Sequence, residues 1–115
     1  MVALEEEFLQ ALGLPYRAVD VAAGDLGAPA VRKIDLEAWF PSQGRYREVT
    51  SCSNTTDFQA RRLGIRWRSH DGLEPPHTLN GTVVTDRAVL AILENLGGDV
   101  PDVLKPFGAP SRIAG

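Results

Sequence analysis

Residues 33–40 read KIDLEAWF, and apolar and charged side chains alternate along this segment. The apolar positions, which share one face of an extended chain, are Ile34, Leu36, Ala38 and Phe40. The turn-forming sequence PSQG follows at 41–44, and residues 45–52 return as a second extended segment. Together the two segments predict an antiparallel β-hairpin at the centre of the fold.

Working outward from this hairpin, apolar spacing and capping residues predict the remaining elements. They are a helix over 3–12, a strand over 16–22, a helix beginning within 53–57 and ending at Leu63, a loop over 69–76, a strand over 77–83, a helix over 87–96 capped by Asp86, and a largely irregular tail over 101–115. The order of elements and the antiparallel pairing of the hairpin predict an α+β class.

The composition of the 115-residue chain is that of one soluble globular domain, with 43% hydrophobic residues, 23% charged residues and a net charge of −3. Cys52 is the single cysteine, so no internal disulfide can form, and this usage fits a reducing compartment. The acidic N-terminus argues against a signal peptide, and no apolar run approaches the ~20 residues of a membrane span. A cytoplasmic location without membrane association is therefore expected.

The middle of the chain concentrates positive charge, since residues 31–70 carry eight Lys or Arg against four acids. Within it, the segment Arg45–Asn54 is unusually polar for a strand, as expected if one face lines a ligand site or is simply solvated at an edge. Glu48 and Ser51 offer a carboxylate and a hydroxyl three residues apart, which suit a hydrated Mg²⁺. Cys52 is expected to be a small core residue rather than a nucleophile.

Two further features suit small anionic or polar ligands. Arg87 lies in the first turn of a predicted helix, where a second positive feature favours a phosphate, unless it is a surface arginine that extends into solvent. The segment His77–Thr82 ends in Asn-Gly-Thr, so Asn80 and Thr82 place an amide and a hydroxyl at a turn. Such groups suit a hydroxy amino acid, although ordinary turn chemistry gives the same pattern.

Taken together, these segments resemble bacterial seryl-tRNA synthetases over about residues 4–108. The resemblance rests on LPYR at 14–17, GDLG at 24–27, DLEAWFPSQ at 35–43, YREVTSCSN at 46–54, DFQARR at 57–62, HTLNGT at 77–82, AILEN at 91–95 and VPDVLKPF at 100–107.

The resemblance implies part of a class II aminoacyl-tRNA synthetase core, an antiparallel β-sheet flanked by helices. This core activates serine with ATP and Mg²⁺ to seryl-adenylate and transfers it to tRNA(Ser). By correspondence of motifs, it implies ATP contacts from Glu48, Val49, Thr50, Ser51 and the motif 3 arginine Arg87. It also implies Mg²⁺ contacts from Glu48 and Ser51, catalytic roles for Arg87 and Glu48, and serine contacts from Thr82 and Asn80. Family members are homodimers.

Family members are several times longer than this chain. By comparison with them, residues 1–115 form a single partial catalytic domain that starts after the tRNA-binding arm and after motifs 1 and 2, with 109–115 as a tail. We therefore expect the chain not to aminoacylate tRNA alone. Two alternatives are a non-catalytic relict or interaction module, and one half of a split synthetase completed by a second chain.

Overall fold

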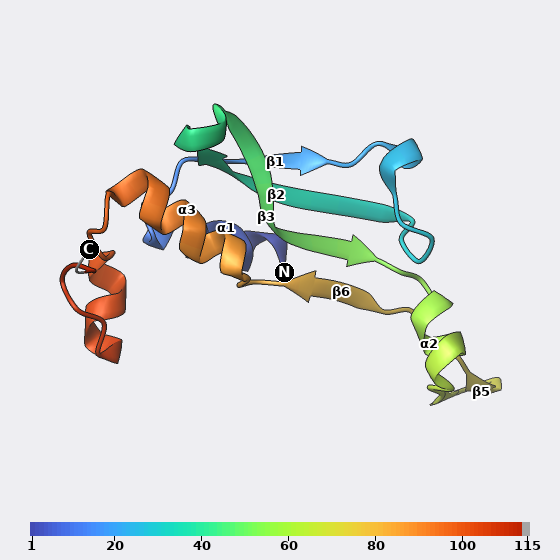
Figure 1. Ribbon diagram of the computed structural model, residues 1–115. Coiled ribbons are helices and arrows are strands. Elements are labelled where there is room, and N and C mark those ends of the chain that lie inside the picture. The colour runs from blue at the N-terminus through green and yellow to red at the C-terminus, as the bar shows by residue number, and fades with distance from the viewer. Residues whose placement is uncertain (114–115) are drawn as a thin grey trace.

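The computed structural model describes residues 1–113 and consists of a four-stranded antiparallel sheet with two helices on one face (Figure 1). The helices are α1 (Val2–Ala11), α2 (Phe58–Leu63) and α3 (Asp86–Leu96), and the strands are β1 (Tyr16–Asp20), β2 (Arg32–Phe40), β3 (Arg45–Asn54), β4 (Trp67–Ser69), β5 (Gly72–Glu74) and β6 (Leu79–Thr82). Short 3-10 helices cover Ala23–Asp25, Pro41–Gln43 and Asp102–Phe107. The predicted α+β class with an antiparallel sheet is confirmed.

The sheet has the order β1-β2-β3-β6, and the predicted hairpin is its centre. Gly44 closes the β2–β3 turn with a φ of 61°, in the left-handed region that glycine adopts without a steric penalty. Within the described residues β1 and β6 each pair with one neighbour, so both lie at sheet edges. The radius of gyration is 17.8 Å, above the roughly 13 Å typical of a compact domain of about 100 residues.

The core lies between one face of the sheet and the helices α1 and α3. Alternation along β2 buries Leu36, Ala38 and Phe40 on this face, as the sequence predicts. They form one cluster with Leu9, Leu12, Leu14, Val49 and Ala91. The opposite face of the sheet carries the charged positions of β2, and it stays open within residues 1–113 because α1 and α3 both cover the apolar side.

A β-bulge interrupts the pairing of β2 with β3 and determines which residues of β3 share a face. Leu36 lies opposite Thr50 and Glu37 lies opposite Glu48, which leaves Val49 as the extra residue. In a regular strand Glu48 and Ser51 would point to opposite faces, because they are three residues apart. The bulge places them on the same face, opposite Glu37 and Asp35 respectively.

Some predicted boundaries are wrong. Residues 69–76 are not simply a loop, since β4 and β5 pair there as a short hairpin (Figure 1). The helix expected to begin within 53–57 begins at Phe58, because β3 extends to Asn54 and the Asn54 side chain accepts a hydrogen bond from Thr56 N. The N-cap of α3 is Thr85 rather than Asp86.

The C-terminal region is more ordered than predicted. A 3-10 helix covers Asp102–Phe107, and Asp99 pairs with Arg112 in an isolated antiparallel bridge. Residues 114 and 115 of the predicted tail lie outside the described part of the chain. Among residues 1–113, no helix combines the length and apolar character that crossing a membrane requires.

Candidate active site

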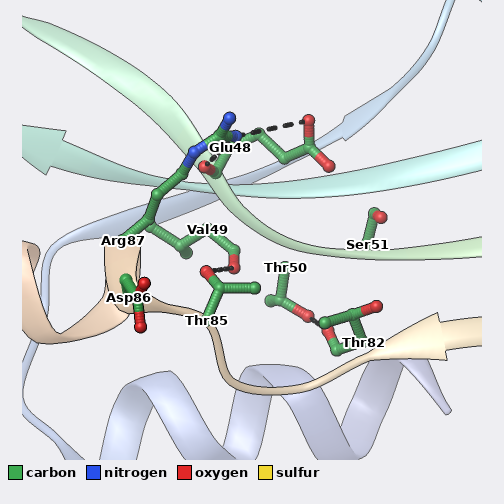
Figure 2. Close-up of a pocket in the computed structure, with 8 residues that line it drawn as sticks. All are labelled: Glu48, Val49, Thr50, Ser51, Thr82, Thr85, Asp86 and Arg87. Atoms are coloured by element: carbon green, nitrogen blue, oxygen red, sulfur yellow. Dashed lines mark hydrogen bonds and ion pairs between the residues drawn. The ribbon is translucent and has the colours of Figure 1, made fainter.

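One open cavity of about 410 Å³ collects most of the residues that the sequence singles out. Its lining comprises Glu48, Val49, Thr50, Ser51, Thr82, Thr85, Asp86 and Arg87. These residues come from β3, the end of β6 and the first turn of α3, which meet at this point (Figure 2). Six of the seven predicted site residues are therefore brought together by the tertiary structure.

Asn80 is the predicted site residue that does not line this cavity. It pairs with Ser53 on β3, whereas Thr82 pairs with Ser51. Asn80 and Thr82 share a face because they are two residues apart in a strand, but Asn80 lies farther from the first turn of α3. The serine-binding role expected for Asn80 therefore stays a prediction without support from the cavity.

Arg87 connects α3 to β3. Its Nη1 atom donates a hydrogen bond of 3.2 Å to the backbone oxygen of Glu48 and lies 4.0 Å from Glu48 Oε2 (Figure 2). The side chain is 59% exposed, so much of the guanidinium still faces solvent. Its position at the N-terminus of an 11-residue helix adds the positive end of the helix dipole to the charge of the guanidinium. These two positive features favour an anion at Arg87, while the carboxylates of Glu48 and Asp86 line the rest of the same cavity.

Two threonine hydroxyls connect β3 to the end of β6 and to the residue that precedes α3. Thr85 Oγ1 donates to the Val49 backbone oxygen at 3.2 Å, and Thr50 Oγ1 donates to the Thr82 backbone oxygen (Figure 2). Val49 and Thr50 are buried, so the chemistry they can offer a ligand comes from the backbone. Sequence reasoning missed Thr85 as a lining residue, although its place just before the helix was the available signal.

The donors at this site fit a magnesium ion that arrives with a nucleotide. Glu48 and Ser51 present oxygen atoms from the same face of β3, and Mg²⁺ prefers oxygen ligands. In residues 1–113 no group of three or more His, Cys, Asp or Glu side chains converges on a metal site. Mg²⁺ commonly takes one or two carboxylates and completes its shell with phosphate and water, so this sparse donor set is consistent with it.

Beneath β3 and β6, a buried carboxylate contacts the single cysteine. Glu5 of α1 is 1% exposed, and its Oε1 atom accepts a hydrogen bond of 2.9 Å from Cys52 Sγ. The other oxygen, Oε2, has no hydrogen-bond partner among residues 1–113. Burial, together with Glu5, raises the pKa of the Cys52 thiol from its ordinary value of 9.0 to about 11. A neutral thiol at this position supports the interpretation of Cys52 as a packing residue.

Alkylation of Cys52 at pH 8 is expected to be about a hundredfold slower in the folded chain than in urea, because raising the thiol pKa from 9.0 to about 11 lowers the thiolate fraction by that factor. The same shift predicts that the stability contributed by the neutral Cys52 thiol is fully present below pH 9. This contribution is lost as the pH rises toward 11. Iodoacetamide labelling followed by mass spectrometry measures the rate. Glu5→Gln should accelerate labelling, whereas Glu7→Gln, at an exposed position, should not. Equal rates in folded and unfolded chains would contradict this view of Cys52.

Comparison with known proteins gives one consistent family. Residues 1–96 match the family model described as tRNA synthetase class II core domain (G, H, P, S and T). The chain is 52% identical over 120 residues to a serine–tRNA ligase of Dictyoglomus thermophilum, covering 98% of this chain and 28% of that protein. It is 55% identical over 114 residues to a serine–tRNA ligase of Thermobifida fusca, covering 93% and 27% respectively.

Solved structures agree with this assignment. The crystal structure of seryl-tRNA synthetase from Pyrococcus horikoshii complexed with ATP superposes with a TM-score of 0.85 at 44% identity, covering 98% of this chain and 28% of that chain. A cytoplasmic serine–tRNA ligase from Naegleria fowleri in complex with AMP gives 0.84 at 42% identity, with the same coverage. The chain spans less than a third of the length of these relatives. It therefore belongs to the class II tRNA synthetase core-domain family and corresponds to the C-terminal part of a seryl-tRNA synthetase.

Proposed function

We propose that this chain forms the part of a serine–tRNA ligase site that binds ATP and serine for the formation of seryl-adenylate. The observation that carries the proposal is the convergence of Glu48, Ser51, Thr82 and Arg87 on one cavity. In this reaction a serine carboxylate oxygen bonds to the α-phosphorus of ATP, the bond to the β-phosphate breaks, and pyrophosphate leaves. Such a transfer needs positive charge and oriented donors around the phosphates and requires no protein nucleophile.

Each residue has a role that its position supports. Arg87 lies at the positive end of α3 and binds phosphate oxygens through its exposed guanidinium. Glu48 and Ser51 hold Mg²⁺, which when bound with the nucleotide neutralises phosphate charge. The Thr82 hydroxyl, opposite Ser51 in the sheet, binds serine. The backbone of Val49 and Thr50 forms the floor between these groups.

We further propose that residues from outside this sequence complete the site, so that the 115 residues alone do not charge tRNA. Two observations support this: the chain covers 28% of its relatives' length, and β1 and β6 present sheet edges within the described residues. The completing residues belong either to a longer form of the same chain or to a separate one, and dimerisation and tRNA(Ser) binding belong to the completed enzyme. Robust serine charging of tRNA by the purified 115-residue chain would contradict incompleteness. The cytoplasmic location stays a prediction from cysteine usage.

A thermal melt with a non-hydrolysable seryl-adenylate analogue tests the proposed binding site. At ~100 times its dissociation constant, a ligand that binds only the folded chain stabilises it by roughly 2.7 kcal/mol, which raises the midpoint by several degrees. We expect this shift in the wild type, and its loss in Glu48→Ala. Arg68→Ala, at an exposed arginine outside the cavity, is the matched control and should keep the shift.

Replacing the seryl group of the analogue by alanyl separates the serine contact from the nucleotide contacts. The wild type should bind the alanyl analogue more weakly than the seryl analogue. Thr82→Val should bind the two analogues with equal affinity, because it lacks the hydroxyl that contacts the seryl group. A clean unfolding transition with no shift for either analogue would favour a relict that kept the fold without the site.

A further inference from the structure

Lys33 of β2 reaches the carboxylate on which the proposed metal site depends. Its Nζ atom lies 2.8 Å from Asp35 Oδ1 and donates a hydrogen bond of 3.1 Å to Glu48 Oε1. The side chain of Lys33 is 23% exposed and that of Asp35 is 14% exposed, so their contact is partly removed from water. Burial opposes the charge on Lys33, but its contacts with Asp35 and Glu48 outweigh burial and raise its pKa.

Glu48 is shared between two cavities on the open face of the sheet. One is the candidate active site, where Arg87 lies 4.0 Å from Glu48 Oε2. The other, of about 470 Å³, is lined by Lys33, Asp35, Glu37 and Asp20 among others, and also by Glu48. The two Glu48 oxygens thus face different cations, Oε1 toward Lys33 and Oε2 toward Arg87. Lys33 and Arg87 therefore balance the negative charge of the Glu48 carboxylate from within the protein.

Asp35 depends on the same ammonium group. Its Oδ1 atom is buried and, apart from the ion pair with Lys33, has no partner in hydrogen-bond geometry among residues 1–113. Burial raises the pKa of Asp35, with Glu48 adding to the effect, while Lys33 acts in the opposite direction. Lys33 can therefore remain on Asp35 after it releases Glu48, which makes exchange at Glu48 Oε1 possible without leaving a buried ammonium unpaired.

We propose that Lys33 is an internal counter-cation that holds Glu48 Oε1 when no divalent cation is bound and must release this oxygen when one is coordinated. The proposal rests on the proposed role of Glu48 in metal binding. A lysine suits exchange because its ammonium is a point charge on a flexible stem, without the fixed fork of an arginine. A consequence is that bare divalent cations bind weakly, and that a cation accompanied by phosphate displaces Lys33 more readily.

Binding of Mn²⁺ alone to the full 115-residue chain, followed by electron paramagnetic resonance, tests the proposal. We expect Lys33→Met to bind Mn²⁺ about tenfold more tightly than the wild type, because a competing unit charge at a partly exposed site is removed. Arg32→Met is the matched control, since Arg32 is the neighbouring cation on β2 but pairs with exposed Asp20, and it should stay within about twofold of the wild type. The double variant Lys33→Met/Glu48→Gln should lose the gain.

No gain in Lys33→Met, an equal gain in Arg32→Met, or a gain that survives Glu48→Gln would each overturn the proposal. Because no nucleotide or serine is present, these outcomes are distinct from a failure of the adenylate analogue to bind. If Lys33→Met does not fold, the wild type still gives a test, since Lys33 and Lys105 are the two lysines of the chain. With ¹³C-labelled lysine, added Mg²⁺ should shift the Lys33 signal and leave that of Lys105, and an unmoved Lys33 signal would overturn the proposal.

Discussion

Leu36→Ala is expected to lower the free energy of unfolding by about 3–5 kcal/mol, and this is the largest stability effect we predict. Leu36 is 0% exposed and lies in the middle of β2, where it contributes to the cluster that joins α1, α3 and the sheet. Its loss leaves a cavity that the neighbouring strands cannot close, because both sides of β2 are paired. Since small domains are stable by only about 5–15 kcal/mol, a much larger fraction of the variant molecules should be unfolded under mild conditions. Urea denaturation monitored by circular dichroism measures the change.

Leu79→Ala provides the matched control for this prediction. Leu79 is also a leucine in a strand of the main sheet, but it is 64% exposed at the start of β6. Its truncation should change the free energy of unfolding by no more than about 0.5 kcal/mol. A loss below 1 kcal/mol for Leu36→Ala, or equal losses for both variants, would mean that the β2 face is not the core of the folded chain.

Arg87→Ala is expected to weaken binding of the seryl-adenylate analogue by about 10- to 100-fold, because hydrogen bonds to charged groups contribute about 1.5–3 kcal/mol. The variant should fold normally, since the Arg87 side chain is 59% exposed and, among the described residues, its hydrogen bond and its ion pair both go to Glu48. Isothermal titration calorimetry separates the affinity from the stability. This is the largest effect on binding that we predict.

Arg87→Lys distinguishes charge from geometry at the same position. A lysine keeps the positive charge near the N-terminus of α3 but cannot form two parallel hydrogen bonds to one phosphate. Its affinity should therefore fall between those of the wild type and Arg87→Ala. If Arg87→Ala binds the analogue as tightly as the wild type, Arg87 does not contact the one phosphate position that the adenylate retains.

The sequence was most informative where local rules and the tertiary environment agree. The alternation in Lys33–Phe40, interrupted only by Trp39, predicted the buried face of β2, because successive side chains of a strand point to opposite faces of the sheet. The turn at 41–44 was equally clear, since Gly44 adopts the left-handed conformation that closes it. The family resemblance then added the site residues, and the cavity contains all of these except Asn80.

Predictions failed where a segment had weak local signals. The hairpin formed by β4 and β5 has three residues in each strand, too few for a periodic pattern to stand out from a polar loop. The α2 boundary was missed because Asn54 fits both the end of a strand and a helix cap, and its pairing with Arg32 in β2 and with Leu79 in β6 selects the strand.

By itself, the sequence determined the α+β class, the central hairpin, the helix that carries Arg87 and, through resemblance, the family. Only the tertiary structure decided that Glu48 and Ser51 share a face, because the bulge at Val49 depends on how β3 packs against β2 and the core rather than on local preference. It also placed Lys33 on Glu48 and Glu5 beneath Cys52. The first contact joins residues separated by 15 positions in the sequence, and the second joins residues separated by 47 positions. No local pattern encodes either contact, because pairing over such separations is set by strand register and helix docking.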